Sequence, residues 1–299
     1  MRTIRGLESY PSEPRTAVVA LGVFDGVHLG HRAILGAAVA RARQAGLAAL
    51  ACTFDPHPAE VLQPDRAPAR LTTVDERLAL IAQTGIEATV VVEFSVEIAA
   101  IEAEAFVKDV LVGCLAAREV VVGFDHRFGR GARGDAHLLE ALGERLGFVA
   151  HVVPPLMVGD VPVSSTEIRA ALQRGDLTLA GRYLGRPYTI RGRVVAGAGR
   201  GRTLGFPTAN LRPERPVIVP PGVYGCRAAV RGARHPAVVN IGVRPTFGEG
   251  ELAVEAHLLD FTGDLYGETL VLELVARIRE ERRFPSLEAL RRQIARDID

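Results

Sequence analysis

The chain has 299 residues, which is long for one hydrophobic core and suits two domains. Its 36 Lys+Arg residues against 35 Asp+Glu give a formal net charge of +1, so it lacks the basic excess that a sequence-independent nucleic-acid binder needs. The three cysteines are too far apart for a disulfide framework, and neither a signal peptide nor a run of about 18 apolar residues is evident. We therefore expect a cytoplasmic protein that binds neither nucleic acid nor a membrane.

Lysine is almost absent from the chain, and Lys108 is its only representative. P-loop kinases and protein kinases each need a lysine that contacts the phosphates of ATP. Lys108 lies in the helical segment EAFVKDVL, without a glycine-rich loop beside it. The sequence therefore excludes both families, and any ATP chemistry has to depend on backbone amides, His, Arg and metal.

From residue 16 to about 155, continuous apolar segments alternate with segments of helical period. The expected strands are 16–24, 47–54, 88–94, 119–124 and 148–154, and the expected helices are 31–46, 73–85, 97–113 and 135–146, with two more after Ser164. Continuous apolar strands joined by helices are typical of a parallel sheet covered on both faces. The first half is therefore expected to be an α/β domain.

At about residue 186 the pattern changes to alternating segments separated by Gly/Pro-rich turns. These segments are 188–195, 222–230, 236–243, 252–260 and 268–278. They predict an antiparallel β-barrel or sandwich, followed by an amphipathic helix over 286–298 with Ser286 as its N-cap. We accordingly expect domains over residues 1–185 and 186–299.

Unusual polar motifs follow the strands of the first half, at the edge where a parallel sheet binds ligands. They are GVFDGVHLGH (22–31), TFDPHP (53–58), GFDHRFG (123–129) and SSTEIR (164–169). His28 and His31 share one face at a helix start, where the helix dipole favours phosphate. Alone, two such histidines are more often surface or metal-site residues, and SSTEIR is an ordinary capped helix. Four motifs at one edge favour function.

GVFDGVHLGH and SSTEIR resemble the HxGH nucleotidyltransferases, and FDPHP with VVGFDHRFG narrows the resemblance to the FMN adenylyltransferase module of bacterial bifunctional riboflavin kinase/FAD synthetases. The resemblance implies a Rossmann-like domain in which His28, His31 and Arg169 act on the phosphates of ATP. The implied ATP site comprises Gly22, Phe24, Asp25, Gly26, His28, His31, Ser164, Ser165, Thr166 and Arg169. The implied flavin site comprises Phe54, Pro56, His57, Pro58, Phe124, Asp125 and Phe128. The sequence departs from the pattern at His126, where an aromatic such as Phe or Tyr is expected.

In the second half, a glycine-rich loop runs into a rigid polar turn, GAGRGRTLGFPTAN (197–210). Such a backbone can surround phosphates without any lysine, and the oxygens of Thr208 and Asn210 suit Mg²⁺. Alone, the segment fits a flexible hairpin equally well. Strand alternation over 252–260 places Glu255 and His257 on one face, where a solvated carboxylate is the ordinary interpretation.

The string GFPTAN resembles the riboflavin kinase signature. The resemblance implies that Glu255 is the general base for the ribityl 5′-hydroxyl, that Arg279 lies near the flavin, and that Thr208 and Asn210 hold Mg²⁺. The implied ATP site comprises Gly197, Gly199, Gly201, Arg202, Gly205, Phe206, Pro207, Thr208 and Asn210. Ala196 stands where the pattern often has histidine.

Together these motifs predict phosphorylation of riboflavin to FMN in the second half, and adenylylation of FMN to FAD plus pyrophosphate in the first. ATP is the co-substrate of both steps, and we expect a monomer or weak homo-oligomer. One alternative is a riboflavin kinase whose adenylyltransferase half is inactive. Another is a flavin-nucleotide carrier or sensor that binds without turnover, and a nucleic-acid binder is a distant third.

Overall fold

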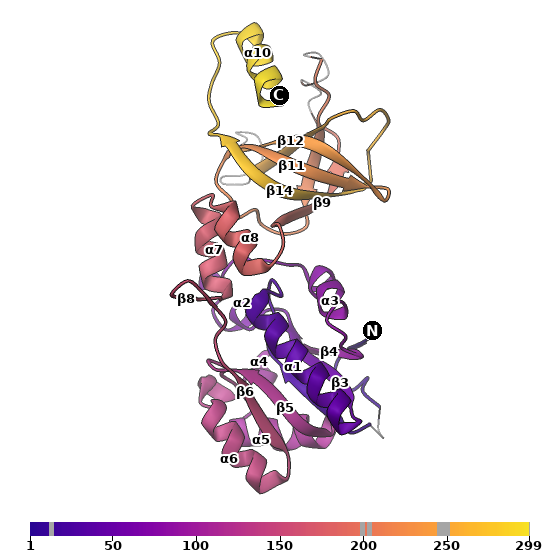
Figure 1. The fold of residues 1–299 in the computed structure, drawn as a ribbon, viewed down its shortest axis with the longest axis vertical. Coiled ribbons are helices and arrows are strands. Elements are labelled where there is room, and N and C mark those ends of the chain that lie inside the picture. Colours follow the sequence, from indigo (N-terminus) through magenta and orange to yellow (C-terminus); the bar gives the residue numbers. More distant parts are fainter. Residues whose placement is uncertain (12–14, 198–200, 202–204, 244–251, 299) are drawn as a thin grey trace. The chain divides into compact units, whose positions relative to one another are not determined.

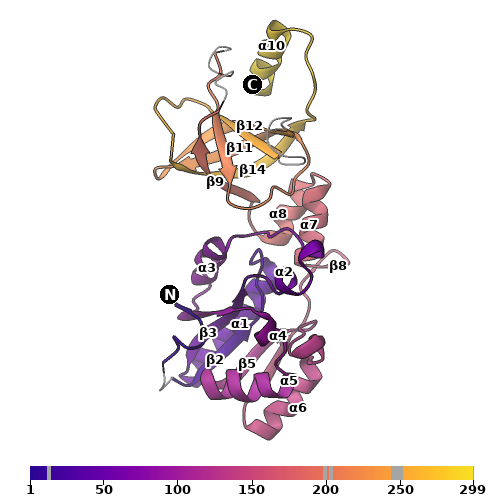
Figure 2. The ribbon, with the colours of Figure 1, turned by 180° about the vertical axis from the view of Figure 1, so that it is seen from behind.

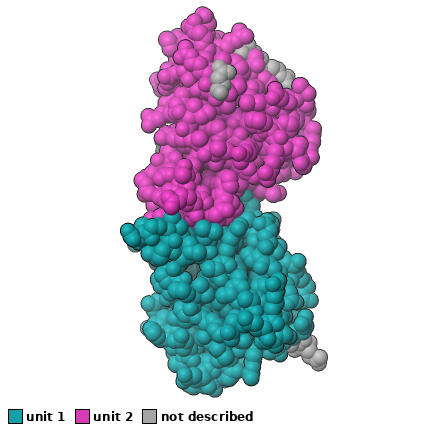
Figure 3. Space-filling model, viewed as in Figure 1, with its two compact units in different colours: residues 1–165 teal, residues 166–299 magenta. Residues whose placement is uncertain are grey.

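The computed structural model describes residues 1–11, 15–197, 201, 205–243 and 252–298. It divides into two compact units, Met1–Ser165 and Thr166–Asp299 (Figure 3). The functional boundary between residues 185 and 186 stays a prediction.

The first unit is built on six parallel strands in the order β1-β4-β3-β2-β5-β6. The strands are β1 (Arg2–Arg5), β2 (Ala17–Leu21), β3 (Ala48–Asp55), β4 (Ala88–Glu93), β5 (Ala117–Gly123) and β6 (Val149–Val153). The helices are α1 (Leu29–Ala45), α2 (Pro58–Leu62), η1 (Pro64–Arg66), α3 (Val74–Ala82), α4 (Val96–Ala99), α5 (Ala103–Ala105), η2 (Phe106–Cys114), η3 (Arg130–Ala132) and α6 (Ala136–Leu146). A short hairpin, β7 (Met157–Val158) and β8 (Val161–Pro162), follows the sheet.

Helices cover both faces of this sheet, as the continuous apolar strands predicted (Figures 1 and 2). On one face, Leu35 of α1 and Ile81 of α3 pack against the sheet. On the other, Leu111 of η2 and Leu139 of α6 do so. Every residue of β2 is buried, because this strand lies inside the sheet and between the two helical layers.

The helix expected over 97–113 is wrong as a single element. The structure has α4, α5 and the π-helical η2 in its place. The break occurs at Glu102, whose backbone is extended (φ −62°, ψ 149°), and the carbonyl of Ile101 accepts from the amide of Arg130 rather than from a helical amide. The edge strand β1 was not predicted, because a four-residue segment shows little periodicity.

The first elements of the second unit are α7 (Ser165–Gln173) and α8 (Leu177–Leu184). The division between the units falls after Ser165, the first residue of α7. A closed antiparallel barrel follows, in the order β10-β13-β12-β11-β14-β9. Its strands are β9 (Thr189–Val195), β10 (Ala209–Pro213), β11 (Gly222–Val230), β12 (Ala233–Val243), β13 (Leu252–Leu258) and β14 (Thr269–Arg279). The terminal helix α10 (Leu287–Ile298) is capped by Ser286, whose hydroxyl accepts from the amide of Ala289 at 3.1 Å; this N-cap prediction is confirmed.

Strand β10 is the element of the barrel that the sequence did not predict. It begins inside the segment interpreted as a polar turn, and it pairs with β9 on one side and β13 on the other. Its five residues are too few for a clear alternation. The strand places Asn210, a predicted ligand of Mg²⁺, in the barrel wall.

Candidate active sites

The first candidate site lies in the loop after β2, and the backbone of this loop is strained. Phe24, Gly26 and Val27 all have positive φ, at 55°, 83° and 39°. Such a conformation costs a β-branched residue like Val27 of the order of 1–3 kcal/mol, and strain of this kind concentrates at functional sites. The loop delivers the chain directly to the start of α1.

His28 and His31 lie against each other at that helix start. Their rings stack with centroids 3.5 Å apart, and Phe24, which is fully buried, meets the His31 ring edge-on at 5.4 Å. His28 is also the N-cap of α1: its Nδ1 accepts from the amide of His31 at 3.2 Å. Its side chain is therefore only 5% exposed, whereas His31 is more accessible.

Gly30 allows this close packing. A Cβ at that position would lie 3.2 Å from the His28 ring and 3.4 Å from the carbonyl oxygen of Val163. The spacing of the two histidines therefore depends on the glycine between them. The prediction that they share one face at the start of a helix is confirmed.

Asp25 has a structural task in the same loop. Its carboxylate, 4% exposed, accepts from the amides of Leu71 and Thr72 at 3.0 and 3.1 Å and from the Thr72 hydroxyl at 3.2 Å. The hydroxyl of Ser165 donates to the carbonyl oxygen of Asp25 at 2.9 Å. Within the first unit, Ser165 is thus linked to the predicted motif at 22–31.

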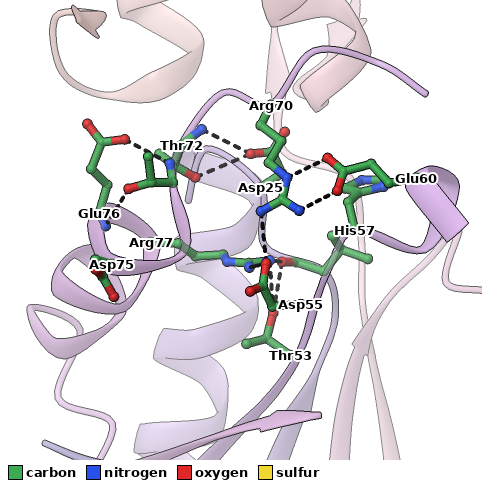
Figure 4. Close-up of polar contacts among 12 residues, drawn as sticks. Asp25, Thr53, Asp55, His57, Glu60, Arg70, Thr72, Asp75, Glu76 and Arg77 are labelled. Atoms are coloured by element: carbon green, nitrogen blue, oxygen red, sulfur yellow. Dashed lines mark hydrogen bonds and ion pairs between the residues drawn. The ribbon is translucent and has the colours of Figure 1, made fainter. Parts of the chain in front are cut away.

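Figure 4 shows a network of charged residues beside this loop that the sequence analysis missed. Arg70 donates to Asp55 at the end of β3, at 2.8 Å, and makes a two-bond ion pair with Glu60 of α2. The hydrogen bonds from Arg70 hold the pKa of Glu60 below its ordinary value. Arg70 therefore ties the FDPHP turn to the loop that follows it.

Arg77 of α3 ties that turn to the histidine loop. Its guanidinium, only 4% exposed, donates to the carbonyl oxygen of Val23 at 2.6 Å and lies 3.7 Å from Asp55. The Thr53 hydroxyl donates to the same Val23 oxygen at 2.9 Å. In the sequence, Arg77 is recognisable only as an arginine in the first turn of an amphipathic helix. Many exposed arginines have that position, so the sequence did not predict this role.

The residues expected to border the flavin lie at the ends of β3 and β5. Phe54 is buried and packs edge-on against Phe94 at 5.7 Å. His57 caps α2 through its Nδ1, between Pro56 and Pro58. In the loop after β5, Phe124 is 49% exposed, and Asp125 is exposed as well. Both sets lie at the same edge of the sheet, as parallel strands require.

His126, the departure from the family pattern, packs as an aromatic. Its ring is nearly parallel to that of Phe128, with an interplanar angle of 19° and a distance of 5.9 Å between the ring centroids. Phe128 packs in turn on Phe106. Nε2 of His126 is buried without a hydrogen-bond partner among the described residues. Burial lowers the pKa of His126 from 6.5 to about 4. A neutral imidazole therefore occupies the expected aromatic position.

This burial predicts a pH dependence of stability. Between about pH 6.5 and 4 the unfolded chain binds a proton at His126 that the folded chain does not, so acid destabilises the fold. We expect wild type to lose about 2 kcal/mol more unfolding free energy than His126→Phe between pH 7 and 5. Urea unfolding at both pH values measures this difference. The control His137→Gln, at a 94% exposed histidine, is expected to behave as wild type; equal losses in all three proteins would contradict the assignment.

Thr166 and Arg169 belong to the second unit, on α7. Their predicted contact with ATP phosphates in the first unit stays a prediction. Ser164 and Ser165 lie on the first-unit side of the division.

The glycine-rich loop of the second unit lies partly outside the described residues, including Gly199 and Arg202. At its described points, a Cβ on Gly197 would lie 2.1 Å from the side-chain amide nitrogen of Asn210, and one on Gly201 would lie 2.4 Å from the carbonyl oxygen of Phe206. Gly205 has a φ of 85°, which favours glycine. Gly197 and Gly201 therefore each lie close to the GFPTAN segment.

Asn210 and Glu255 are direct cross-strand neighbours in the barrel wall. Asn210 of β10 is in register with Glu255 of β13, and Glu255 is in register with Asn240 of β12. Directly opposed side chains share a face of the sheet, so three polar groups form a row on the outer face. Asn210 is 9% exposed, and Glu255 is half-buried. Alternation predicted the face of Glu255; Asn240 was not predicted.

A cavity of about 350 Å³ opens beside Thr208. Its lining residues are Val194, Pro207, Thr208, Ala209, Ala256, Leu258, Phe261, Gly263, Asp264, Leu265 and Tyr266. His257 meets the carbonyl oxygen of Pro207 at 2.7 Å, and its ring packs edge-on against Phe206. The sequence analysis missed the segment 261–266, which reads as an ordinary turn.

Arg279 anchors the terminal helix. Its Nε and Nη2 donate to both oxygens of Asp297 of α10, at 2.9 and 2.7 Å, and its guanidinium lies 5.6 Å from the ring of Phe284. The side chain of Asp297 is 3% exposed. The expected role of Arg279 near the flavin stays a prediction.

The two units define a class of protein: an α/β unit with a histidine pair at a helix start, followed by a closed barrel with a glycine-rich loop. A family model described as FAD synthetase matches residues 10–167, and one described as riboflavin kinase matches residues 184–299. Two curated relatives carry the description bifunctional riboflavin kinase/FMN adenylyltransferase. The Escherichia coli protein is 42% identical over 299 residues, covering 99% of this chain and 96% of the relative. The Bacillus subtilis protein is 40% identical over 291 residues, covering 95% and 91%.

The chain therefore belongs to the bifunctional riboflavin kinase/FMN adenylyltransferase family, with an FAD synthetase domain before a riboflavin kinase domain. A solved Streptococcus pneumoniae structure described as a macrolide-efflux protein is also similar: TM-score 0.90 and 32% identity, over 99% of this chain and 97% of that one. In the described part of the present chain, no helix is both long and apolar enough to cross a membrane.

Proposed function

We propose that the protein makes FAD from riboflavin in two ATP-dependent steps, one at each candidate site. In the barrel, riboflavin is phosphorylated to FMN and ADP leaves. In the α/β unit, FMN attacks the α-phosphate of a second ATP, and FAD and pyrophosphate leave. The row of Asn210, Glu255 and Asn240 beside the glycine-rich loop supports the first step. The histidine pair in its strained loop supports the second.

For the kinase step, Glu255 is the proposed base. It takes the proton of the ribityl 5′-hydroxyl while the oxygen of that hydroxyl forms its bond to the γ-phosphorus of ATP. The glycine-rich loop is proposed to bring backbone amides to the phosphates. The cavity at Thr208 is the proposed place for the nucleotide. Because phosphoryl transfer is largely dissociative, we expect these positioning contacts to matter more than the base.

Mg²⁺ fits the residues at this site. Thr208 and Asn210 offer hard oxygen donors two residues apart, and Mg²⁺ characteristically takes few protein ligands and completes its shell with phosphate and water. Within the described ranges no cluster of three or more His, Cys, Asp or Glu side chains could hold a metal. When bound, the ion would neutralise phosphate charge; Thr208 and Asn210 are the residues proposed to hold it.

For the adenylyltransferase step, His28 and His31 are proposed to donate hydrogen bonds to the phosphates as charge shifts toward pyrophosphate. Nδ1 of His28 accepts the helix cap, so its Nε2 is the nitrogen that carries a proton. The flavin is proposed to bind between the FDPHP turn and the exposed Phe124. The three cysteines are free thiols, which suits the proposed cytoplasmic location.

The overall proposal is tested by incubating the purified chain with riboflavin, ATP and Mg²⁺ and separating the flavins by chromatography. We expect FMN to appear first and FAD after it, with ADP and pyrophosphate released. Accumulation of FMN alone would indicate an inactive adenylyltransferase half. Bound flavin without either release would indicate a carrier or sensor.

Glu255→Gln is expected to lower the kcat of FMN formation by about 10²-fold. General acid–base catalysis accelerates reactions by about 10²- to 10⁴-fold, and the lower end applies here because a dissociative phosphoryl transfer depends little on the base. FMN-to-FAD conversion is expected to stay unchanged. Steady-state ADP release from riboflavin and ATP measures the effect. The matched control is Glu273→Gln, on β14 of the same barrel, where the carboxylate pairs with Arg234 at 3.3 Å. A similar loss in both variants would argue against a base at Glu255.

A further inference from the structure

A second cavity in the barrel unit is lined by none of the residues assigned above. It has a volume of about 350 Å³ and lies between the segment 282–285 and α10. Four of its lining residues are arginines: Arg282, Arg283, Arg292 and Arg296. Phe284, Pro285, Ala289 and Gln293 complete the lining. We call this cavity the arginine pocket.

The lining of the arginine pocket holds four guanidinium groups and no carboxylate. Residues 282–296 contain five arginines and one carboxylate, Glu288, which pairs with Arg292 at 3.2 Å. Within the part of the chain that the structure describes, neither Arg283 nor Arg296 makes an ion pair or hydrogen bond. Like charges held around one cavity repel each other, and a bound anion removes that repulsion.

The walls of the pocket are joined by contacts among their own residues and with Asp297. Arg282 lies over the ring of Phe284 at 5.0 Å and donates to Oε1 of Gln293. Gln293 donates in turn to Asp297 at 2.7 Å, and Asp297 accepts the two-bond ion pair from Arg279. Segment 282–285 and α10 are therefore joined before any ligand binds, which limits the entropy cost of binding.

The donors that remain available suit phosphate. Guanidinium groups present paired N–H donors that match phosphate oxygens, and they keep their charge at any physiological pH. Several guanidinium groups around one cavity can contact a compact ion at the same time. Such a cavity therefore favours a compact ion and disfavours an extended polymer. The net charge of only +1 for the whole chain also disfavours a nucleic acid.

We propose that the arginine pocket binds a diphosphate, either as free pyrophosphate or as the diphosphate of a nucleotide. Arg283 and Arg296 supply the principal donors, and Arg282 and Arg292 complete the positive wall. The proposal does not depend on either reaction proposed above, and it concerns a site separate from the cavity at Thr208.

The chain contains no tryptophan, which allows a site-specific test. Phe284→Trp places one indole in the pocket wall and keeps an aromatic face beneath Arg282. Emission from this indole reports the arginine pocket and not the two ATP sites. We expect a saturable emission change on titration with pyrophosphate at constant ionic strength. Absence of a saturable change in the folded variant, verified by circular dichroism, would overturn the proposal.

Two further variants in the Phe284→Trp background separate contact from general charge. Arg283→Gln with Arg296→Gln removes the two principal donors, and we expect half-saturation to rise at least about tenfold. The control Arg291→Gln removes the same kind of charge from α10 at an exposed arginine outside the cavity lining. It is expected to change half-saturation less than about twofold. Equal effects of the double variant and the control would overturn the proposal.

Two other anions, ADP and sulfate, identify the ligand chemistry. If ADP and pyrophosphate saturate the signal alike, the pocket binds diphosphate in either form; if pyrophosphate alone does so, it binds the free ion. Both results support the site. Sulfate is expected to bind at least about tenfold more weakly, because it offers a single tetrahedral group. Half-saturation by sulfate at the same concentration as pyrophosphate would overturn the assignment of a diphosphate.

Discussion

His31→Ala is expected to lower FMN adenylylation by on the order of 10²- to 10³-fold, which is the usual loss when one preorganised donor to a developing anion is removed. Riboflavin phosphorylation is expected to stay at the wild-type rate. His31 lies at the positive end of α1, with its ring stacked on His28 and supported by Phe24. Pyrophosphate release from FMN and ATP measures the first activity, and ADP release from riboflavin and ATP measures the second.

Controls separate the chemistry of the histidines from their structural role. His28→Ala removes the N-cap of α1 as well as a phosphate donor, and the lost cap alone costs about 1 kcal/mol of stability. His28→Asn retains a capping side chain, so it should keep the melting temperature and still lose FAD formation. His137→Ala, at a 94% exposed histidine of α6, should keep both activities. Loss of both activities in folded His31→Ala would contradict two separate sites.

The sequence predicted the parts of the fold that follow from apolar periodicity. Continuous apolar segments such as 47–54 have to be buried on both faces, so a parallel sheet followed directly. Alternation over 252–258 placed Glu255 on the face opposite Val254, and the barrel confirms that face. What failed were short or broken elements: β1, β10, and the helix expected over 97–113, where a tertiary hydrogen bond from Arg130 takes the carbonyl of Ile101. No local pattern encodes such a long-range contact.

The residues of the candidate sites also fall into two groups, those that a local sequence pattern predicted and those that only tertiary contacts bring into place. Motif residues such as His28 and His31 come together because they lie within one helical turn, a spacing visible in the sequence. Arg70 and Arg77 were missed because their partners, Glu60, Asp55 and the carbonyl of Val23, are brought to them by tertiary packing. Asn240 was missed for the same reason: its relation to Glu255 is a matter of strand register.

These two kinds of residue imply different mutational signatures. Arg77 is 4% exposed and joins the FDPHP turn to the histidine loop, so its loss removes a buried hydrogen bond and is expected to act mainly on folding. His31 and Thr208 are more accessible and border the proposed ligand sites, so their loss should leave the fold intact and act on turnover. Melting temperature measured beside activity therefore distinguishes a residue that holds a site together from one that acts in it.

Thr208→Val provides the corresponding test of the barrel. Valine retains the shape of threonine and replaces its hydroxyl by a methyl group, so the change isolates one oxygen beside the cavity of about 350 Å³. We expect FMN formation to fall by on the order of 10³-fold, because an oxygen proposed to hold the Mg²⁺ that neutralises phosphate charge is lost. Conversion of supplied FMN to FAD should continue at the wild-type rate.

Thr208→Ser restores the hydroxyl and should recover most of the lost activity, which a purely steric role of the side chain would not predict. The loss in Thr208→Val should also exceed that in Glu255→Gln, since positioning outweighs proton transfer in a dissociative phosphoryl transfer. The opposite ranking would make the base the dominant group. Unchanged FMN formation in Thr208→Val would move the kinase site away from the GFPTAN segment altogether, because Thr208 lines the cavity beside that segment.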